Sequence, residues 1–264
     1  MDEHPPTSGG VRDVKSAART VDLLEALAAR QNRPAKLREL SEALGVPKSS
    51  LYALLRTLVS RGWVRTDATG TLYGIGIRAL LAGTSYLDAD PYLRLVQPYL
   101  DELAERTGET IHFGRLDGSD IIYLATRESP AYLRPYSRVG RRLPAFTTAL
   151  GKALLAERTP TDRESHLPAP LLAMTPHTLT NPAALDADLD AARQLGYAVD
   201  QEENTLGLRC LGVALHYTEP VTDAVSCSVP LARLTPSRES EILNALVGVR
   251  DTIERVAGPP RTYP

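Results

Sequence analysis

Cysteine is almost absent from this chain, because only Cys210 and Cys227 occur among its 264 residues. So few cysteines exclude a disulfide-bonded secreted scaffold and favour a reducing compartment, and we expect a cytoplasmic protein. The apolar fraction of 43 % and the charged fraction of 23 % are ordinary for a globular protein. The length suits two modest domains or one large domain.

Metal-ligand spacing and membrane segments are absent as well. None of the five histidines has a second histidine or a cysteine within four residues, so we expect no metal site. No run approaches the roughly 18 apolar residues that span a bilayer, and we expect no membrane association. The start, MDEHPPTSGG, lacks the apolar core of a secretory signal, and we interpret residues 1–10 as a disordered tail.

Catalytic and cofactor motifs are also missing. The chain has no G-x-S-x-G nucleophile elbow and no glycine-rich phosphate loop, so we expect neither an enzyme nor a bound cofactor. Cys210 with His112 or His216 is the available thiol–imidazole combination, but nothing in the sequence places these residues together. Two alternatives stay open for the C-terminal half: an enzyme, or an assembly module that acts without any ligand.

Charge is distributed unevenly along the chain, although the formal net charge is only −2. Residues 11–80 carry 12 Lys/Arg against 6 Asp/Glu, which leaves 18 against 26 for the rest. A basic front followed by an acidic rear indicates that the front binds a polyanion. Chance is the alternative, because an excess of this size over 70 residues is modest.

Three helical patterns and a hairpin fill residues 14–76. The segments VKSAARTVDLLEALAAR, KLRELSEALG and KSSLYALLRTLVS predict three helices, and Pro47 suits the first turn of the third. The runs WVRT and TLYGI flank the turn-rich DATG and predict a hairpin. The apolar spacing that supports the first and third helices falls on Val21, Leu24, Leu27 and Ala28, and on Leu51, Leu54, Leu55, Leu58 and Val59. We therefore predict a winged helix-turn-helix over residues 11–76 and a linking helix over 77–90.

The third helix has an outer face that is rich in hydroxyl groups and poor in charge. A helix of this size fits the major groove, where small hydroxyls allow a close approach and an arginine reaches a guanine or a phosphate. A solvated polar face on an ordinary amphipathic helix is the alternative. The predicted DNA-binding residues are Ser49, Ser50, Tyr52 and Arg56, with Lys36, Lys48 and Arg65 on backbone phosphates.

Residues 91–258 alternate between strand-like and helical segments. Strand-like stretches such as TIHFGRLDG, DIIYLATRE and DAVSCSVPL are separated by helical ones, among them NPAALDADLDAARQLG with Asn181 as N-cap and Gly196 as stop. The pattern predicts a mixed antiparallel sheet with helices, so the whole chain falls in the α+β class.

The sequence resembles the IclR (isocitrate lyase regulator) family of bacterial transcription factors. The blocks that carry the resemblance are SAARTVDLLEALA, LRELSEALGVPKSSLYALLRTLVSRGWV, LPAFTTALGKALLA, LGYAVDQEENTLGLRCLGVAL and AVSCSVPLARL. The resemblance implies a GAF-like α/β effector-binding domain behind the winged helix-turn-helix. It also implies a homodimer or a dimer of dimers that binds a pseudo-palindromic operator in double-stranded DNA, with repression the commoner outcome.

The resemblance further implies an effector site in the C-terminal domain. Its residues would be Ala149, Leu150, Asp200, Cys210, Ser226 and Ser228. Two departures from the family pattern change expected contacts. Ala53 stands where many members have an arginine, so Arg56 is expected to take part of that role, and Leu150 is expected to narrow the pocket.

Physical chemistry makes a small carboxylate the expected effector. Ser226 and Ser228 lie two apart on a strand and point to the same side, and residues 148–151 open a helix whose N-terminus favours an anion. Asp200 would accept a hydrogen bond from a ligand hydroxyl, or would instead cap a turn or pair with Arg209. Cys210 is as readily a core thiol. An apolar lid or wall is expected from Leu133, Val139, Leu143 and Phe146.

Overall fold

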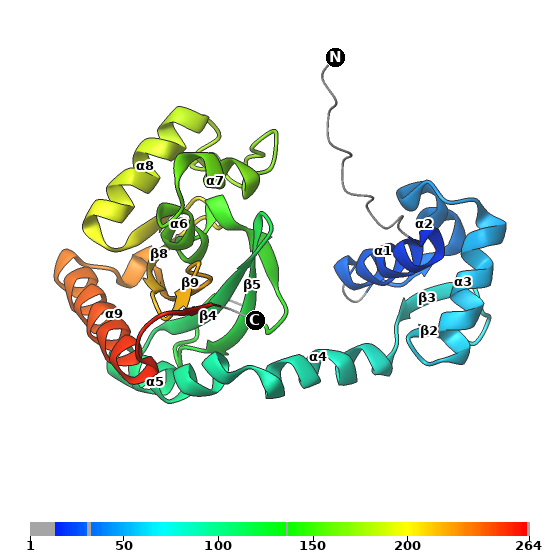
Figure 1. The fold of residues 1–264 in the computed structure, drawn as a ribbon, viewed down its shortest axis with the longest axis horizontal. Coiled ribbons are helices and arrows are strands. Elements are labelled where there is room, and N and C mark those ends of the chain that lie inside the picture. The colour runs from blue at the N-terminus through cyan, green and yellow to red at the C-terminus, as the bar shows by residue number, and fades with distance from the viewer. Residues whose placement is uncertain (1–13, 31–32, 136, 263–264) are drawn as a thin grey trace, which may run out of the picture. The chain divides into compact units, whose positions relative to one another are not determined.

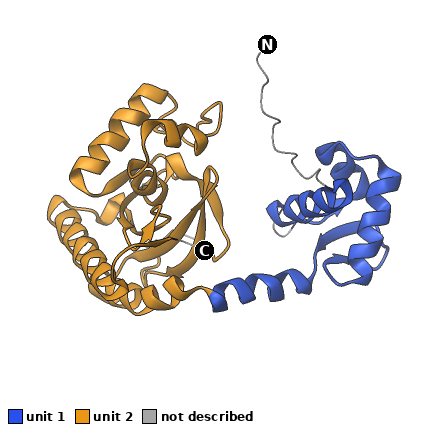
Figure 2. Cartoon of the chain, viewed as in Figure 1, with its two compact units in different colours: residues 1–89 blue, residues 90–264 orange. Residues whose placement is uncertain are grey.

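The computed structural model describes residues 14–30, 33–135 and 137–262, and the predicted tail of residues 1–10 lies outside this part of the chain. The chain divides into two compact units, Met1–Ala89 and Asp90–Pro264 (Figure 2). Each unit has a hydrophobic core of its own.

Helices α1, α2 and α3 and a small antiparallel sheet form the first part of the first unit, and helix α4 (Ile77–Ala89) follows them (Figure 1). The sheet has the strand order β1-β3-β2. The elements are α1 (Lys15–Ala29), β1 (Ala35–Lys36), α2 (Leu37–Leu44), α3 (Lys48–Ser60), β2 (Val64–Thr66) and β3 (Leu72–Ile75). The predicted helix-turn-helix and hairpin wing are therefore confirmed. Strand β1 was not predicted, because two residues are too short for a periodic signal.

Apolar residues at helical spacing on α1 and α3 form much of the hydrophobic core of this unit. Leu51, Leu55 and Leu58 of α3 are buried, as the sequence predicted. The predicted apolar face of α1 is wrong in part, because Val21 is 54 % exposed and Ala28 is also exposed, whereas Leu23 is fully buried. Val21 and Leu23 are both apolar and belong to two overlapping stripes on α1, so the sequence alone does not show which stripe packs against the core.

A tight turn orients α3 relative to α2. Gly45 adopts a left-handed conformation with φ of 62°, which glycine tolerates without strain. The hydroxyl of Ser41 donates to the carbonyl oxygen of Val46 at 2.7 Å and closes the turn. Pro47 is the N-cap of α3, one position before the first turn in which we expected it.

Helix α4 (Ile77–Ala89) buries none of its residues. A stripe of apolar side chains on it is open to solvent, and we call it the α4 stripe. Its members are Ile77, Leu80 and Leu81, which are 68 %, 59 % and 55 % exposed, and the partly buried Leu87.

A six-stranded antiparallel sheet forms the centre of the second unit, with the order β6-β5-β4-β10-β8-β7. Its strands are β4 (Thr110–Asp117), β5 (Asp120–Arg127), β6 (Arg142–Pro144), β7 (Ala198–Gln201), β8 (Leu208–Leu215) and β10 (Asp223–Pro230). A separate parallel pair joins β9 (Thr218–Glu219) to β11 (Arg261–Thr262). The predicted α+β class is confirmed.

Helices cover both faces of this sheet (Figure 1). Helices α5 and α9 pack together on one face, and α6 lies on the other with α8 against it. The helices of this unit are α5 (Pro91–Thr107), α6 (Ala149–Ala156), α7 (Pro160–Ser165), α8 (Pro182–Leu195) and α9 (Pro236–Ala257). Helix α8 has the predicted ends, because the Asn181 side chain accepts from the Ala184 N–H and Gly196 terminates it with φ of 74°.

Glycine lets α6 pack directly on β8. A Cβ atom on Gly212 would lie 2.5 Å from the carbonyl oxygen of Ala149, closer than real Cβ contacts come. The absence of a side chain at this position therefore places the first turn of α6 against the sheet.

His216 joins the end of β8 to two helices. Its Nδ1 lies 2.8 Å from Glu254 Oε1 on α9, and its Nε2 lies 3.3 Å from Glu157 Oε1 at the end of α6. The hydrogen bonds to Glu157 and then to Glu254 raise the pKa of His216 to about 9, although partial burial opposes the charge.

We expect the contribution of His216 to stability to depend on pH. Because the pKa of His216 is higher in the folded protein than in the unfolded chain, its protonated ring stabilises the fold. This contribution is complete below the unfolded-state pKa near 6.5 and is lost as pH rises through about 9. The melting temperature of His216→Gln should therefore fall furthest below the native one at pH 6 and approach it by pH 9.5. A constant difference across this range would contradict the assignment.

Candidate functional site

The outer face of α3 is open to solvent in the structure. Ser49, Ser50, Tyr52 and Arg56 are all exposed on it, and Lys48 is its first residue. The side chain of Tyr52 is 46 % exposed, which is high for an aromatic ring. The structure therefore leaves this predicted face uncovered by the rest of its unit.

The two remaining predicted phosphate contacts lie on the two edges of the small sheet. Lys36 is on β1, Arg65 is on β2, and β3 runs between them. Both side chains are exposed. Lys48, Arg56 and Arg65 form no ion pair with any other described residue, so their charges are available to a ligand. By contrast, Arg30 and Arg38 are paired with Glu39 and Glu42.

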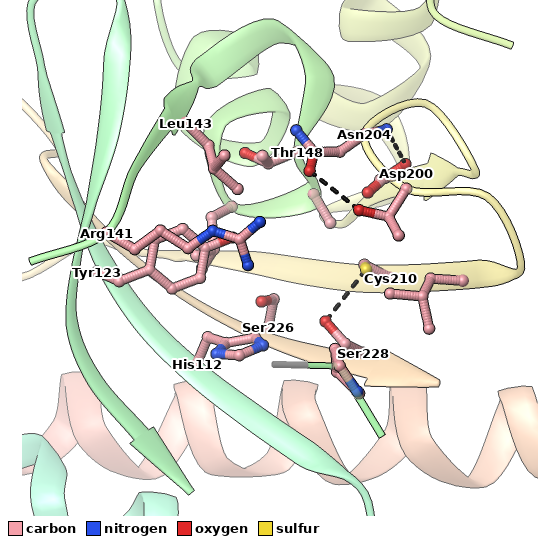
Figure 3. A pocket seen from close by; sticks show the side chains of 15 residues that line it. His112, Tyr123, Arg141, Leu143, Thr148, Asp200, Asn204, Cys210, Ser226 and Ser228 are labelled. Atoms are coloured by element: carbon pink, nitrogen blue, oxygen red, sulfur yellow. Dashed lines mark hydrogen bonds between the residues drawn. The ribbon is translucent and has the colours of Figure 1, made fainter. Parts of the chain in front are cut away.

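A pocket opens in the second unit where the first turn of α6 faces the strands (Figure 3). It has an empty volume of about 410 Å³, part of it open to solvent. All six predicted effector residues line this pocket: Ala149, Leu150, Asp200, Cys210, Ser226 and Ser228.

Strand register brings the polar members of this set together. Ser228 pairs with Cys210 and Cys210 pairs with Asp200 across β10, β8 and β7. The Cys210 sulfur lies 3.1 Å from the Ser228 hydroxyl. Ser226 and Ser228 both face the pocket, because alternate residues of a strand point to the same side.

The first turn of α6 supplies the opposite wall. Thr148 is the N-cap, and its hydroxyl accepts from the Gly151 N–H at 3.0 Å. Thr148, Ala149 and Leu150 all line the pocket. The positive end of the helix dipole therefore lies at the pocket wall, where it favours a negative group.

The sequence interpretation missed several lining residues. His112 on β4 is opposite Ser226 in the register, and the wall also contains Tyr123, Arg141 and Asn204. Placing His112 beside the pocket requires the pairing of β10 with β4, which the sequence left undetermined. Arg141 lies just before β6 in a segment without periodicity, so no sequence signal identifies it.

The expected apolar wall is wrong in part, and of the alternatives left open for Asp200 the structure shows the capping of a turn rather than a pairing with Arg209. Leu143 does line the pocket, but Leu133 and Val139 are exposed elsewhere, and Phe146 is buried in the core. Asp200 does not pair with Arg209, because Arg209 binds Glu239 on α9 at 2.8 Å. The Asp200 carboxylate instead accepts from the backbone N–H of Glu203 at 2.7 Å.

The titratable groups of the pocket are tuned by burial. Burial raises the pKa of Asp200 to about 6, against the opposing effect of the Glu203 N–H. Burial and then the charge of Arg141 lower the pKa of His112 to about 3, so its ring is neutral. Burial and Asp200 raise the pKa of the Cys210 thiol well above its ordinary value.

The candidate thiol–imidazole pairs lack the chemistry of a nucleophile and its base. His112 and Cys210 line the same pocket, but the thiol is held protonated and His112 Nδ1 lies 3.2 Å from the Thr126 hydroxyl. His216 is bound to Glu157 and Glu254. The pocket is therefore suited to holding a ligand rather than to attacking it.

A buried lysine fixes the loop that closes one side of the pocket. Lys152 on α6 is 1 % exposed, and its Nζ lies 2.6 Å from Glu203 Oε1, 2.6 Å from the Val199 carbonyl oxygen and 2.7 Å from Asp188 Oδ2. The neighbouring Asn204 donates to the Thr147 hydroxyl at 2.9 Å. These contacts hold residues 200–205 against the start of α6.

Neither a metal site nor a membrane span is found in the described ranges. Among residues 14–30, 33–135 and 137–262, no three His, Cys, Asp or Glu side chains are grouped as a metal ion requires. No helix in these ranges combines the length and the hydropathy that crossing a bilayer requires.

Comparison with known proteins gives matches over nearly the whole chain. Residues 16–68 match the model of the IclR helix-turn-helix domain, and residues 84–255 match that of the bacterial transcriptional regulator IclR C-terminal domain. The transcriptional repressor IclR of Escherichia coli is 34 % identical over 240 residues, which are 89 % of this chain and 87 % of that protein.

Solved structures share the fold. An IclR transcriptional regulator from Alicyclobacillus acidocaldarius superposes with a TM-score of 0.81 at 25 % identity, over 94 % of this chain and all of that one. An IclR homolog from Microbacterium hydrocarbonoxydans, solved in complex with 4-hydroxybenzoate, gives a TM-score of 0.72 at 24 % identity, over 91 % and 99 % of the two chains.

Proposed function

From the premise that this chain belongs to the IclR family of DNA-binding transcriptional regulators, we propose that it is a repressor controlled by a small organic acid. The family and the relatives are regulators, not enzymes, so the enzyme alternative is not retained. In this proposal residues 11–76 bind the operator, residues 77–90 connect, and residues 91–258 bind the effector in the cytoplasm.

The outer face of α3 reads the operator in this proposal. The Ser49 and Ser50 hydroxyls donate to phosphates or base edges, Tyr52 packs on sugar or a thymine methyl, and Arg56 reaches a guanine. Lys36, Lys48 and Arg65 neutralise phosphates on either side. The observation that supports this assignment is that Lys48, Arg56 and Arg65 form no ion pair with the described residues of their unit.

Arg56→Ala should weaken specific binding by about 1–3 kcal/mol if the guanidinium reads a base. The measurement is fluorescence anisotropy with a duplex from the chain's own promoter region, at fixed salt. Arg94→Ala removes the same charge from an exposed position in the second unit and should change affinity little. Equal losses in both variants would remove Arg56 from base recognition.

A second copy of this chain covers the α4 stripe in this proposal. Ile77, Leu80 and Leu81 expose a contiguous apolar surface that no other described residue buries. A pseudo-palindromic operator needs two recognition helices about 34–36 Å apart, which a homodimer supplies. Dimers can pair further into dimers of dimers.

The effector of the proposal is a carboxylate, and the pocket supports this through the joint placement of its polar groups. The start of α6, the Arg141 guanidinium and the Ser226 and Ser228 hydroxyls all line it. Asp200 can accept from a hydroxyl elsewhere on the same ligand. The homolog solved with 4-hydroxybenzoate holds a ligand of this class, a hydroxylated aromatic acid.

The single observation that carries the proposal is that one pocket gathers all six residues implied by the family resemblance. Isothermal titration of the full chain with 4-hydroxybenzoate, benzoate and acetate tests it, with operator affinity measured with and without each acid. At least one acid should bind and lower operator affinity. An assembly module without ligand would bind none of them, and its operator affinity would not respond.

Ser226→Ala combined with Ser228→Ala should blunt the response to the acid by about tenfold or more. Losing one hydrogen bond between a hydroxyl and a charged ligand weakens ligand binding by about 1.5–3 kcal/mol. Operator affinity without effector should stay unchanged, because removing two hydroxyls adds no bulk to the pocket and leaves the strand pairing intact. Normal induction of the double variant would refute a role for the two hydroxyls.

A further inference from the structure

A buried ion cluster lies at the residue where α4 gives way to α5, and we call it the Asp90 cluster. It consists of Asp90, Arg115, Asp223 and Tyr217. Arg115 on β4 is 6 % exposed and binds Asp223 with two parallel hydrogen bonds, from Nε at 2.6 Å and from Nη2 at 2.7 Å. The Tyr217 hydroxyl donates to the same carboxylate at 2.8 Å.

The same arginine also binds the first residue of this unit. Arg115 Nη1 contacts Asp90 Oδ2, while Asp90 Oδ1 accepts from the N–H groups of Tyr92 at 3.0 Å and Leu93 at 2.9 Å. Asp90 is thus the N-cap of α5 and directly follows the last residue of α4. Its one carboxylate ties the helix start to β4.

Aromatic stacking reinforces this attachment. Tyr92 in the first turn of α5 stacks on Tyr217 with ring centroids 4.3 Å apart and planes 5° from parallel. Burial alone would lower the pKa of Arg115, but the hydrogen bonds that its guanidinium donates to Asp223 and Asp90 outweigh this effect and raise that pKa. The guanidinium therefore keeps its positive charge although it is buried.

Both strands joined by Arg115 also carry pocket residues, His112 on β4 and Ser226 on β10. In the register of β4 and β10, Arg115 pairs with Asp223 and His112 pairs with Ser226. These pairs are three residues apart, about 10 Å along the strands at roughly 3.3 Å per residue. A ligand between Ser226 and the start of α6 therefore acts on the strand pair whose other end holds Asp90.

Resting on the proposed function, we propose that the Asp90 cluster couples occupancy of the pocket to the connecting helix α4. Coupling requires an element whose arrangement both sites bias. The paired strands β4 and β10 are this element. A ligand at Ser226 and the Asp90 carboxylate at Arg115 each favour one arrangement of these two strands. In this role Asp90 is a positioning residue that touches neither effector nor DNA.

Asp90→Asn separates the two functions of this side chain. Asparagine caps a helix as well as aspartate does, so the hydrogen bonds to Tyr92 and Leu93 are kept. The neutral amide no longer attracts Arg115, which remains bound to Asp223. Asp101→Asn is the matched control, because Asp101 lies on the same helix and binds Arg127 of β5 in an exposed ion pair.

The experiment measures operator affinity of the full chain when the pocket is perturbed in two ways. The first perturbation is the probe 4-hydroxybenzoate, and the second is Ser226→Phe, whose ring fills the space beside β10; Ser228→Leu replaces it if the melting curve shows loss of fold. Each is applied to the native chain, to Asp90→Asn and to Asp101→Asn, with the promoter duplex at fixed salt.

We expect at least one perturbation to shift the operator Kd fivefold or more in the native chain and in Asp101→Asn, and less than twofold in Asp90→Asn. A full shift in Asp90→Asn would overturn the coupling role while leaving the proposed function intact. If no perturbation shifts the Kd in the native chain, the proposed effector control fails and the coupling fails with it. The two failures are therefore distinguishable.

Discussion

Replacing Leu80 and Leu81 together with glutamate is expected to give a monomer that binds its operator about 100-fold or more weakly. The two side chains are 59 % and 55 % exposed on a helix without buried residues, so the change should leave the fold of each unit intact. Two linked DNA-reading units gain about 10²–10⁴ in avidity over one, and that gain is lost in a monomer. Analytical ultracentrifugation and anisotropy measure the two effects.

The control for this variant carries the same added charge elsewhere on α4. Ala82→Glu with Ser85→Glu places two carboxylates at exposed positions outside the α4 stripe, Ala82 on the far side of the helix and Ser85 at the border of the stripe, one turn after Leu81. This control should remain dimeric and keep operator affinity within a few-fold. A Leu80/Leu81 variant that stays dimeric would show that the second copy docks elsewhere.

Lys152→Met is expected to destabilise the second unit by about 3–5 kcal/mol near pH 7.5, because it leaves the buried carboxylate of Glu203 without its cation. Glu203 Oε2 already lacks a partner among the described residues. Burial raises the pKa of Glu203, and loss of Lys152 would raise it further. The destabilisation should therefore be smaller at pH 5 than at pH 7.5, because uptake of a proton by Glu203 removes the unpaired buried charge.

Chemical denaturation at the two pH values measures this effect. Arg127→Met breaks the exposed ion pair with Asp101 and should cost no more than about 1 kcal/mol at either pH. Adding Glu203→Met to Lys152→Met should restore much of the stability, since the buried charge is then removed. A loss that did not depend on pH would show that packing, not charge, makes Lys152 important.

Local sequence signals predicted the first unit almost completely. Gly45, the α3 stripe and the DATG turn each specify a short-range structure, and the helix-turn-helix needs little beyond them. The error at Val21 arose because two apolar stripes overlap in α1 and only tertiary packing selects one. The apolar stripe of α3 also predicted that the opposite, outer face of this helix is exposed.

The effector pocket was predictable only in part. Its six implied residues came from the family resemblance, and strand alternation supported Ser226 and Ser228. Arg141 comes from a loop whose course no local rule predicts. The Asp90 cluster joins residues 25 and 108 positions apart in sequence, so it depends on strand order, which the sequence left undetermined.

The close packing of α6 on β8 limits how ligand preference can be changed. With 2.5 Å between an added Cβ at Gly212 and the Ala149 carbonyl, even alanine would push the helix away from the sheet. We therefore expect the pocket wall that the first turn of α6 forms against β8 to tolerate few substitutions, either in evolution or in engineering. Attempts to retune this regulator as a biosensor should vary Tyr123, Leu143 and Thr205 instead, which line the same pocket.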